Sequence, residues 1–118
     1  MSARDDLEAI ITENSNILHI DAKVYLNILK ASLSESYKDI ARLDEAIASR
    51  QYSLIHSIAH RLKGVYGNLR FDVLHEVSEN IDVLAKENGS IEEIYQQYLI
   101  LKEALDKLDR DLQSLEDI

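Results

Sequence analysis

Apolar residues recur at spacings of three and four along most of this chain, which is the spacing of one face of an α-helix. The longest run lies between residues 21 and 51, and a second long run follows residue 90. This pattern predicts five helices, of which the first is short. The apolar positions of the second predicted helix are Tyr25, Ile28, Leu29, Leu33, Tyr37, Ile40, Leu43 and Ile47.

Polar residues mark the beginning and end of the first two predicted helices. Ser2 with Asp5 is a possible cap for the short helix, whose apolar face holds Leu7, Ile10 and Ile11. We expect this helix to break at Asn14, Ser15 and Asn16. Asp21 has the side chain of a good N-cap for the second helix, which should end near Ser49 to Gln51.

The remaining three helices have equally clear boundaries. The third spans 52–69, and the fourth starts near Asp72 and is closed by Asn88 and Gly89. Ser90 and Glu93 form a capping box that opens the fifth helix. On the fourth helix the expected packing side is Val73, Leu74, Val77, Ile81 and Leu84, and on the fifth it includes Leu101, Leu105, Leu108, Leu112 and Leu115.

Short connections between long helices favour antiparallel neighbours. The chain is therefore predicted to be all-α, an antiparallel up-down-up-down four-helix bundle with the short N-terminal helix packed at one end. An alternative is that the fifth helix extends as a coiled coil, because the spacing of its leucines also fits an a/d pattern.

Composition narrows the possible functions. At 118 residues, the chain is expected to fold as a single domain over 1–118, and it has no proline, three glycines and no cysteine. Disulfide and thiolate chemistry are thereby excluded. A net charge of −9 disfavours nucleic acid as a partner. The first twenty residues hold charges instead of a long apolar run, so we expect neither a signal peptide nor a membrane span. The lack of cysteine fits a reducing cytoplasm, and we expect a monomer.

The third helix carries an unusual group of residues opposite its apolar stripe. At about 100° per residue, His56, Lys63, Gly64 and Gly67 all fall within about 60° of His60. A glycine inside an exposed helix costs roughly 1 kcal/mol relative to alanine, and the sequence offers no packing reason for two of them. This face is therefore expected to be approached closely by another molecule.

The residue types on this face favour a phosphorylated histidine. His60 has no hydroxyl or thiol near it in a triad-like order and no aspartate within one turn of helix, so it is not arranged as the base of a hydrolase. Lys63, one turn away, supplies a positive charge that suits a phosphoryl group. The chain has no phosphate-binding loop or kinase signature, so another protein must supply the phosphate.

The segment 59–69, with the sequence AHRLKGVYGNL, resembles the signature of histidine-containing phosphotransfer (HPt) domains of bacterial phosphorelays. The order of helices is similar over nearly the whole chain. The resemblance implies that His60 accepts a phosphoryl group from a receiver-domain aspartate and passes it to another receiver. It also implies that Lys63 steadies the group, while Gly64 and Gly67 allow close docking.

The same resemblance implies a division of chemistry between two proteins. The receiver domain would supply Mg²⁺ and most catalytic groups, so this chain needs no cofactor and acts as a phosphotransfer intermediate, not an enzyme. Receiver domains are the expected partners, and a hybrid sensor kinase is a further candidate. A non-phosphorylated adaptor or inhibitor of a kinase or receiver is the alternative function.

Three positions depart from the family pattern. Tyr66 stands where a small residue is usual, and its angle places it at the edge of the core. Arg70 replaces a common glycine near the docking face, where it would either contact phosphate or hinder some receivers. Arg50 replaces a frequent turn glycine, which should affect stability more than function.

The other histidines have simpler interpretations. His56 and His60 are spaced like a pair of zinc ligands, but the sequence identifies no third ligand, so no metal site is predicted. His56 is instead placed at the edge of the docking site, where it could tune the pKa of His60. His75 is expected to be solvated.

Overall fold

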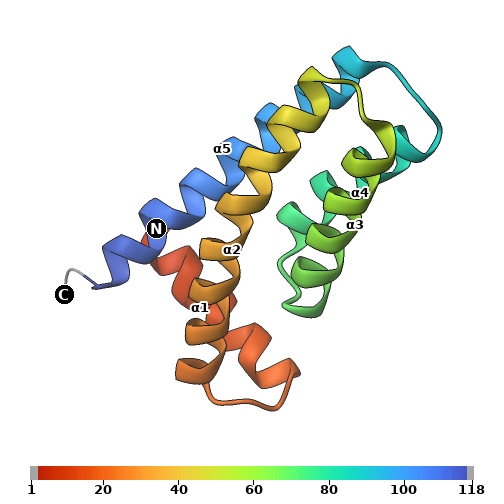
Figure 1. Cartoon of the computed structure of the whole chain (residues 1–118). Coiled ribbons are helices and arrows are strands. Elements are labelled where there is room, and N and C mark those ends of the chain that lie inside the picture. The colour runs from red at the N-terminus through yellow and green to blue at the C-terminus, as the bar shows by residue number, and fades with distance from the viewer. Residues whose placement is uncertain (1–2, 117–118) are drawn as a thin grey trace.

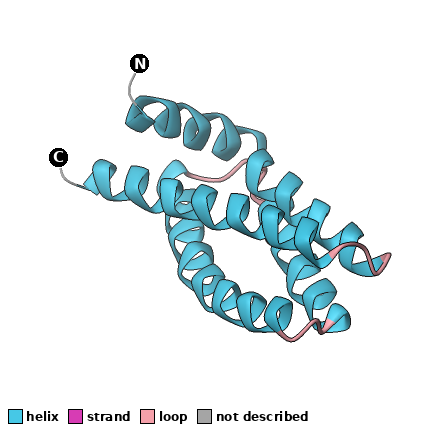
Figure 2. Cartoon of the chain, turned by 90° about the horizontal axis from the view of Figure 1, so that it is seen from above, coloured by secondary structure: helices cyan, strands magenta, loops and turns pink. Residues whose placement is uncertain are grey.

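The computed structural model describes residues 3–116, which form five helices and contain no strand (Figures 1 and 2). The helices are joined by connections of three or four residues. Their bounds are α1 Ala3–Ile17, α2 Ala22–Ala48, α3 Tyr52–Asn68, α4 Asp72–Lys86 and α5 Ile91–Glu116. The bounds of α2 to α5 agree closely with the sequence pattern, whereas α1, which was expected to be short, has 15 residues, as many as α4.

Two long helices and a shorter hairpin make up the body of the protein. α2 and α5 have 27 and 26 residues, whereas α3 and α4 have 17 and 15. α3 packs between α2 and α4, and α5 packs against both α4 and α2, so the four helices close into a ring of contacts. In Figure 1 the α3–α4 hairpin lies beside one half of α2, and α1 packs against the half that extends beyond it.

Leucine, isoleucine and tyrosine side chains from all the long helices share one core. The leucine stripe of α5 is buried inside this chain, with Leu101 and Leu105 fully covered. The coiled-coil alternative for α5 is therefore wrong. The largest fully buried side chains are Tyr25, Leu29, Leu43, Ile55, Ile58, Leu62, Tyr66, Leu74, Ile81, Ile94, Leu101 and Leu105.

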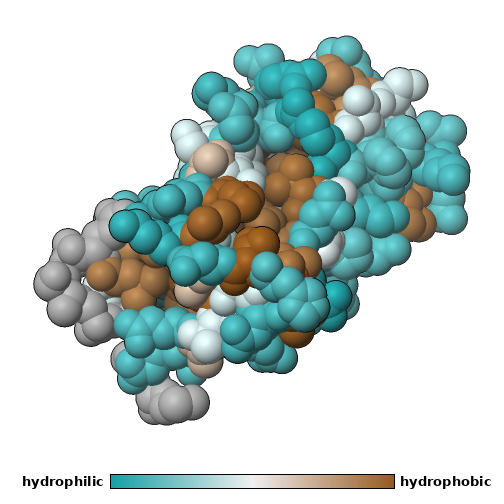
Figure 3. All heavy atoms as spheres, turned by 90° about the horizontal axis from the view of Figure 1, so that it is seen from below, coloured by the Kyte–Doolittle hydropathy of each residue, from teal (hydrophilic) through white to brown (hydrophobic). Residues whose placement is uncertain are grey.

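Some apolar side chains stay at the surface. Figure 3 shows apolar atoms gathered on the face seen from below, surrounded by polar ones. Ile28, which the pattern of α2 placed on the packed side, is 43% exposed. A groove between α1, α4 and α5 is lined by Leu7, Ile10, Phe71, Val73, Leu74, Ala104 and Leu108.

The predicted break at Asn14 to Asn16 is wrong, because α1 continues to Ile17. Asn14 is buried, and its Nδ2 lies 3.1 Å from Tyr25 Oη and 3.1 Å from the carbonyl oxygen of Arg70. These tertiary hydrogen bonds satisfy an amide that would otherwise favour a turn. The Ser2 cap lies outside the described residues.

The packing face of α4 is rotated relative to the prediction. Val73 is 58% exposed and Leu84 is only half-buried, whereas the polar residues Ser78 and Asp82 are buried. The reason is that α4 has neighbours on two sides and turns part of its face toward α3. The buried residues of α4 are Leu74, Val77, Ser78, Ile81, Asp82 and Ala85.

Two of the three predicted N-caps, at Asp21 and Ser90, are present. The Asp21 carboxylate accepts a hydrogen bond from the backbone amide of Lys23 at 2.8 Å. Ser90 Oγ accepts one from the backbone amide of Glu93 at 3.3 Å, which is half of a capping box.

The first four helices end in the same backbone motif, with a left-handed residue just beyond the helix. In α2, the Arg50 amide donates to the Ile47 carbonyl and the Gln51 amide donates to the Ala46 carbonyl, which defines a Schellman motif. Glycine usually occupies the left-handed position, yet none of the four is glycine here. The four residues, with φ between 52° and 57°, are His19, Arg50, Arg70 and Asn88.

Among the described residues, no helix combines the length and the apolar composition that a membrane span requires.

We expect Arg50→Gly to stabilise the protein by up to about 1 kcal/mol, because glycine adopts a positive φ without the penalty of a Cβ. Arg50→Ala removes the same side chain but keeps the Cβ, so it should give no such gain. Denaturant unfolding of the two variants checks this prediction. Equal stability would show that the left-handed backbone carries no strain at this position.

Candidate functional site

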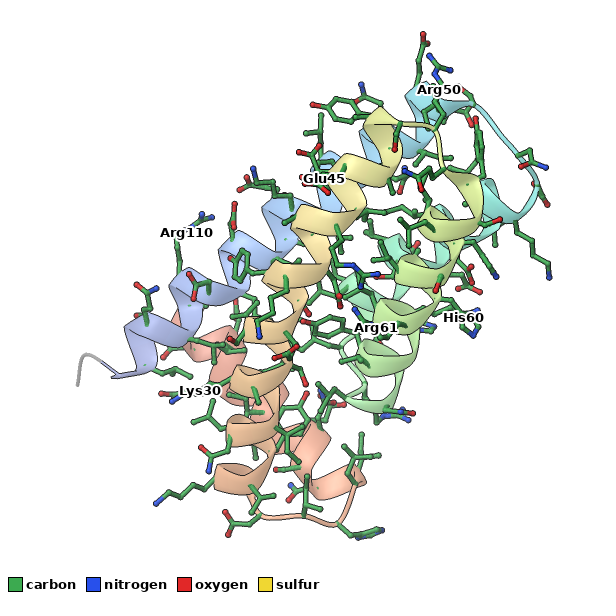
Figure 4. All side chains as sticks on the ribbon, in the orientation of Figure 1. Lys30, Glu45, Arg50, His60, Arg61 and Arg110 are labelled. Atoms are coloured by element: carbon green, nitrogen blue, oxygen red, sulfur yellow. The ribbon has the colours of Figure 1, made fainter. Side chains whose placement is uncertain are left out.

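His60 lies on the outer side of α3, where it is available to another molecule. Its side chain is 68% exposed and points away from α2 in Figure 4. The next residue, Arg61, instead forms an ion pair with Asp39, a buried carboxylate of α2. The two neighbouring residues therefore face different surroundings. A step of about 100° per residue turns Arg61 toward α2, whereas His60 faces outward.

A carboxylate from α4 reaches the His60 imidazole. The Oδ2 atom of Asp82 lies 3.2 Å from His60 Nδ1, and the Asp82 side chain is only 8% exposed. The other oxygen, Oδ1, is in ion-pair contact with Nδ1 of His56. Two histidines one turn apart on α3 therefore share one buried carboxylate of α4.

Lys63 extends the same cluster by one more turn of α3. Its Nζ lies 3.8 Å from Glu79 Oε1 and 4.0 Å from Asp82 Oδ2, with the side chain 31% exposed. These separations are those of loose ion pairs, not tight hydrogen bonds. The lysine charge is thus held beside His60 while remaining open to a stronger anion.

The contact with Asp82 determines what the imidazole can do. A carboxylate next to Nδ1 favours the tautomer with the proton on Nδ1, so that Nε2 carries the free lone pair. Because the side chain is largely exposed, that lone pair faces the surroundings. His60 is therefore arranged as a nitrogen nucleophile on Nε2, with a buried carboxylate behind it.

The two glycines of α3 have different surroundings. A Cβ added at Gly64 would meet no heavy atom within 4 Å, so the space over it is open. A Cβ at Gly67 would lie 3.0 Å from Nδ1 of His75. Gly67 therefore does have a packing reason, contrary to the expectation from the sequence. The His75 imidazole of α4 occupies the space that a side chain at position 67 would take.

His75 is also not the solvated residue that the sequence suggested. Its Nδ1 lies 3.1 Å from the carbonyl oxygen of Lys63, and its Nε2 lies 4.0 Å from Glu79 Oε2. His75 therefore links α4 to α3 through the Lys63 carbonyl, next to the candidate site.

Arg70 follows the end of α3 in the left-handed conformation, so an angle on the helical wheel does not describe its position. It lies ten residues after His60, which corresponds to about 15 Å along a helix. Its backbone carbonyl accepts the hydrogen bond from Asn14.

Tyr66 is fully buried, and burial raises the pKa of its phenol, whose oxygen lies 2.6 Å from Ser36 Oγ.

His56 and His60 have the spacing of a pair of zinc ligands on one helix. Within residues 3–116, no group of three or more histidine, aspartate or glutamate side chains is placed to hold a metal ion.

A family model for the Hpt domain matches residues 27–116. The chain belongs to the Hpt domain family. Hpt domains are phosphocarriers of phosphorelays, and the family interacts with the receiver domains of response regulators. Comparisons with curated proteins and with solved structures gave no significant match.

The acidic residues of α4 that lie next to His60 and Lys63 were not predicted from the sequence of this Hpt domain. The sequence shows no aspartate within one helical turn of His60, yet Asp82 reaches it from α4, and Glu79 reaches Lys63. A signal was present, because His75, Glu79 and Asp82 are spaced by four and three residues and so share one face of α4. Only the packing of α4 on α3 shows that this face meets His60.

The two glycines should respond differently to alanine. Gly64→Ala is expected to stabilise the Hpt domain by up to about 1 kcal/mol, since the methyl group enters open space. Gly67→Ala should lack this gain, because the methyl group must displace the His75 ring from its contact with Lys63. Denaturant unfolding of both variants checks the difference, and equal gains would show that His75 yields freely.

Proposed function

We propose that this Hpt domain accepts a phosphoryl group on Nε2 of His60 from the aspartyl phosphate of one receiver domain and passes it to the aspartate of another. The observation that carries the proposal is the contact between Nδ1 of the largely exposed His60 and the buried Asp82, which favours the proton on Nδ1 and a free lone pair on Nε2. The four long helices, which we take to form an up-down-up-down bundle, would serve as the rigid support.

The transfer step balances without any further reactant. The Nε2 lone pair attacks phosphorus, the bond from phosphorus to the receiver's aspartyl oxygen breaks, and the aspartate leaves as a carboxylate. The proton on Nδ1 stays in place, so the phosphorylated ring gains positive charge next to Asp82. The carboxylate therefore stabilises the ring most after phosphorylation, when its charge is greatest.

Lys63 and Gly64 support the step in different ways. The ammonium group of Lys63 would move from its loose pairs with Glu79 and Asp82 toward the phosphoryl oxygens, which carry more charge. The open space over Gly64 would let a receiver domain approach His60 closely. The receiver would supply Mg²⁺ and most of the catalytic groups, so this chain serves as the phosphate-carrying intermediate.

We expect His60→Gln to abolish phosphate acceptance while leaving the fold intact, because an exposed substitution usually changes stability by no more than about 0.5 kcal/mol. The measurement is incubation with a phosphorylated receiver domain, followed by an assay for acid-labile, alkali-stable phosphate. His19→Gln, at an exposed histidine in the α1–α2 turn, is the control and should still be labelled. Labelling of the His60 variant would assign the phosphate to another residue, and binding without labelling of the wild type would favour an adaptor.

Lys63→Ala is expected to slow transfer roughly tenfold to a hundredfold, the equivalent of one hydrogen bond to a charged group. Lys63→Arg keeps the charge and should lie closer to the wild type. The rate of transfer from a phosphorylated receiver and the lifetime of the phosphohistidine both test this role. Unchanged values for the alanine variant would remove Lys63 from the mechanism.

A further inference from the structure

The two oxygens of the Asp82 carboxylate contact different histidines. Oδ2 lies 3.2 Å from His60 Nδ1 and 4.0 Å from Lys63 Nζ, whereas Oδ1 contacts His56 Nδ1. Apart from that contact, neither Oδ1 nor His56 Nδ1 has a hydrogen-bond partner, although both atoms are buried. These two atoms are thus the natural partners of each other.

A carboxylate held by one oxygen alone is poorly oriented. The last torsion of an aspartate side chain is broad, so the plane of the carboxylate is set by its partners and not by a rotamer well. His60 is 68% exposed and is a weak anchor for this plane, whereas the His56 Nδ1 atom is buried. The contact with His56 therefore fixes the direction in which Oδ2 meets His60.

We propose that His56 is a positioning residue for phosphotransfer: by holding Oδ1 of Asp82, it keeps Oδ2 against His60 Nδ1 and so maintains the tautomer in which Nε2 of His60 is the nucleophile. The two imidazoles lie side by side with ring centroids 5.7 Å apart. His56 itself does not touch the phosphoryl group in this scheme. The effect on transfer rests on the proposed function, whereas the effect on the tautomer does not.

Asparagine and leucine at position 56 form a matched pair for testing this role. Their side chains have nearly the same shape, but the asparagine Nδ2 stands where the histidine has Nδ1 and can donate to Asp82 Oδ1. His56→Asn should therefore rescue the contact that His56→Leu loses. Leucine is the better helix former, so a purely structural role would favour the leucine variant instead.

The first measurement is the tautomer of His60 in the unphosphorylated protein, read from the ¹⁵N shifts of its ring nitrogens at a pH where both imidazoles are neutral. We expect mainly the Nδ1–H form in the wild type and in His56→Asn, and a loss of this form in His56→Leu. The second is the rate of receiver-to-His60 transfer. It should fall roughly tenfold in His56→Leu and stay within a factor of about three of the wild type in His56→Asn, as expected when the tautomer with a free Nε2 lone pair is depleted. Thermal unfolding is recorded for all three proteins.

The outcomes separate the two proposals. Equal tautomer populations in His56→Leu and the wild type would overturn the positioning role, as would a His56→Asn variant that resembles His56→Leu in both measurements. If the wild type accepts no phosphate from any receiver tested, the proposed function fails, and the tautomer comparison alone then decides the role of His56.

Discussion

The packing of α4 on α3 around one buried carboxylate is the constraint on which the candidate site depends. Asp82 brings a negative charge into a largely covered position, where an unpaired ion would be costly. Contacts with His56, His60 and the more distant Lys63 offset that cost. Because all three lie on one face of α3, the same interaction that holds the hairpin together also orients the His60 imidazole.

The short turn between α3 and α4 makes this arrangement precise. Residues 69–71 connect the two helices, and the Arg70 carbonyl within the turn accepts a hydrogen bond from Asn14 of α1. Nearby, the His75 ring fills the space over Gly67 and lies within hydrogen-bonding distance of the Lys63 carbonyl. These contacts at and near the turn define the register of α4 against α3, and this register places Asp82 next to His60.

The site is open on its outer side, which fits a reaction that two proteins share. His60 is largely exposed, and no side chain covers the space over Gly64 among the described residues. Phosphoryl transfer needs positioning and charge stabilisation in a site that excludes water. A flat helix surface cannot exclude water alone, so the docked receiver would complete the site.

The sequence by itself determined the five helices, most of the core and the gathering of His60, Lys63 and Gly64 on one face of the third helix, because helical periodicity and capping are local properties. Tertiary structure decided the rest. The polarity of Asn14 predicted a break that long-range hydrogen bonds prevent, and the apolar pattern of α4 left out the buried Asp82. The partners of His60 and Gly67 come from α4, and contacts between helices leave no periodic signal in either one alone.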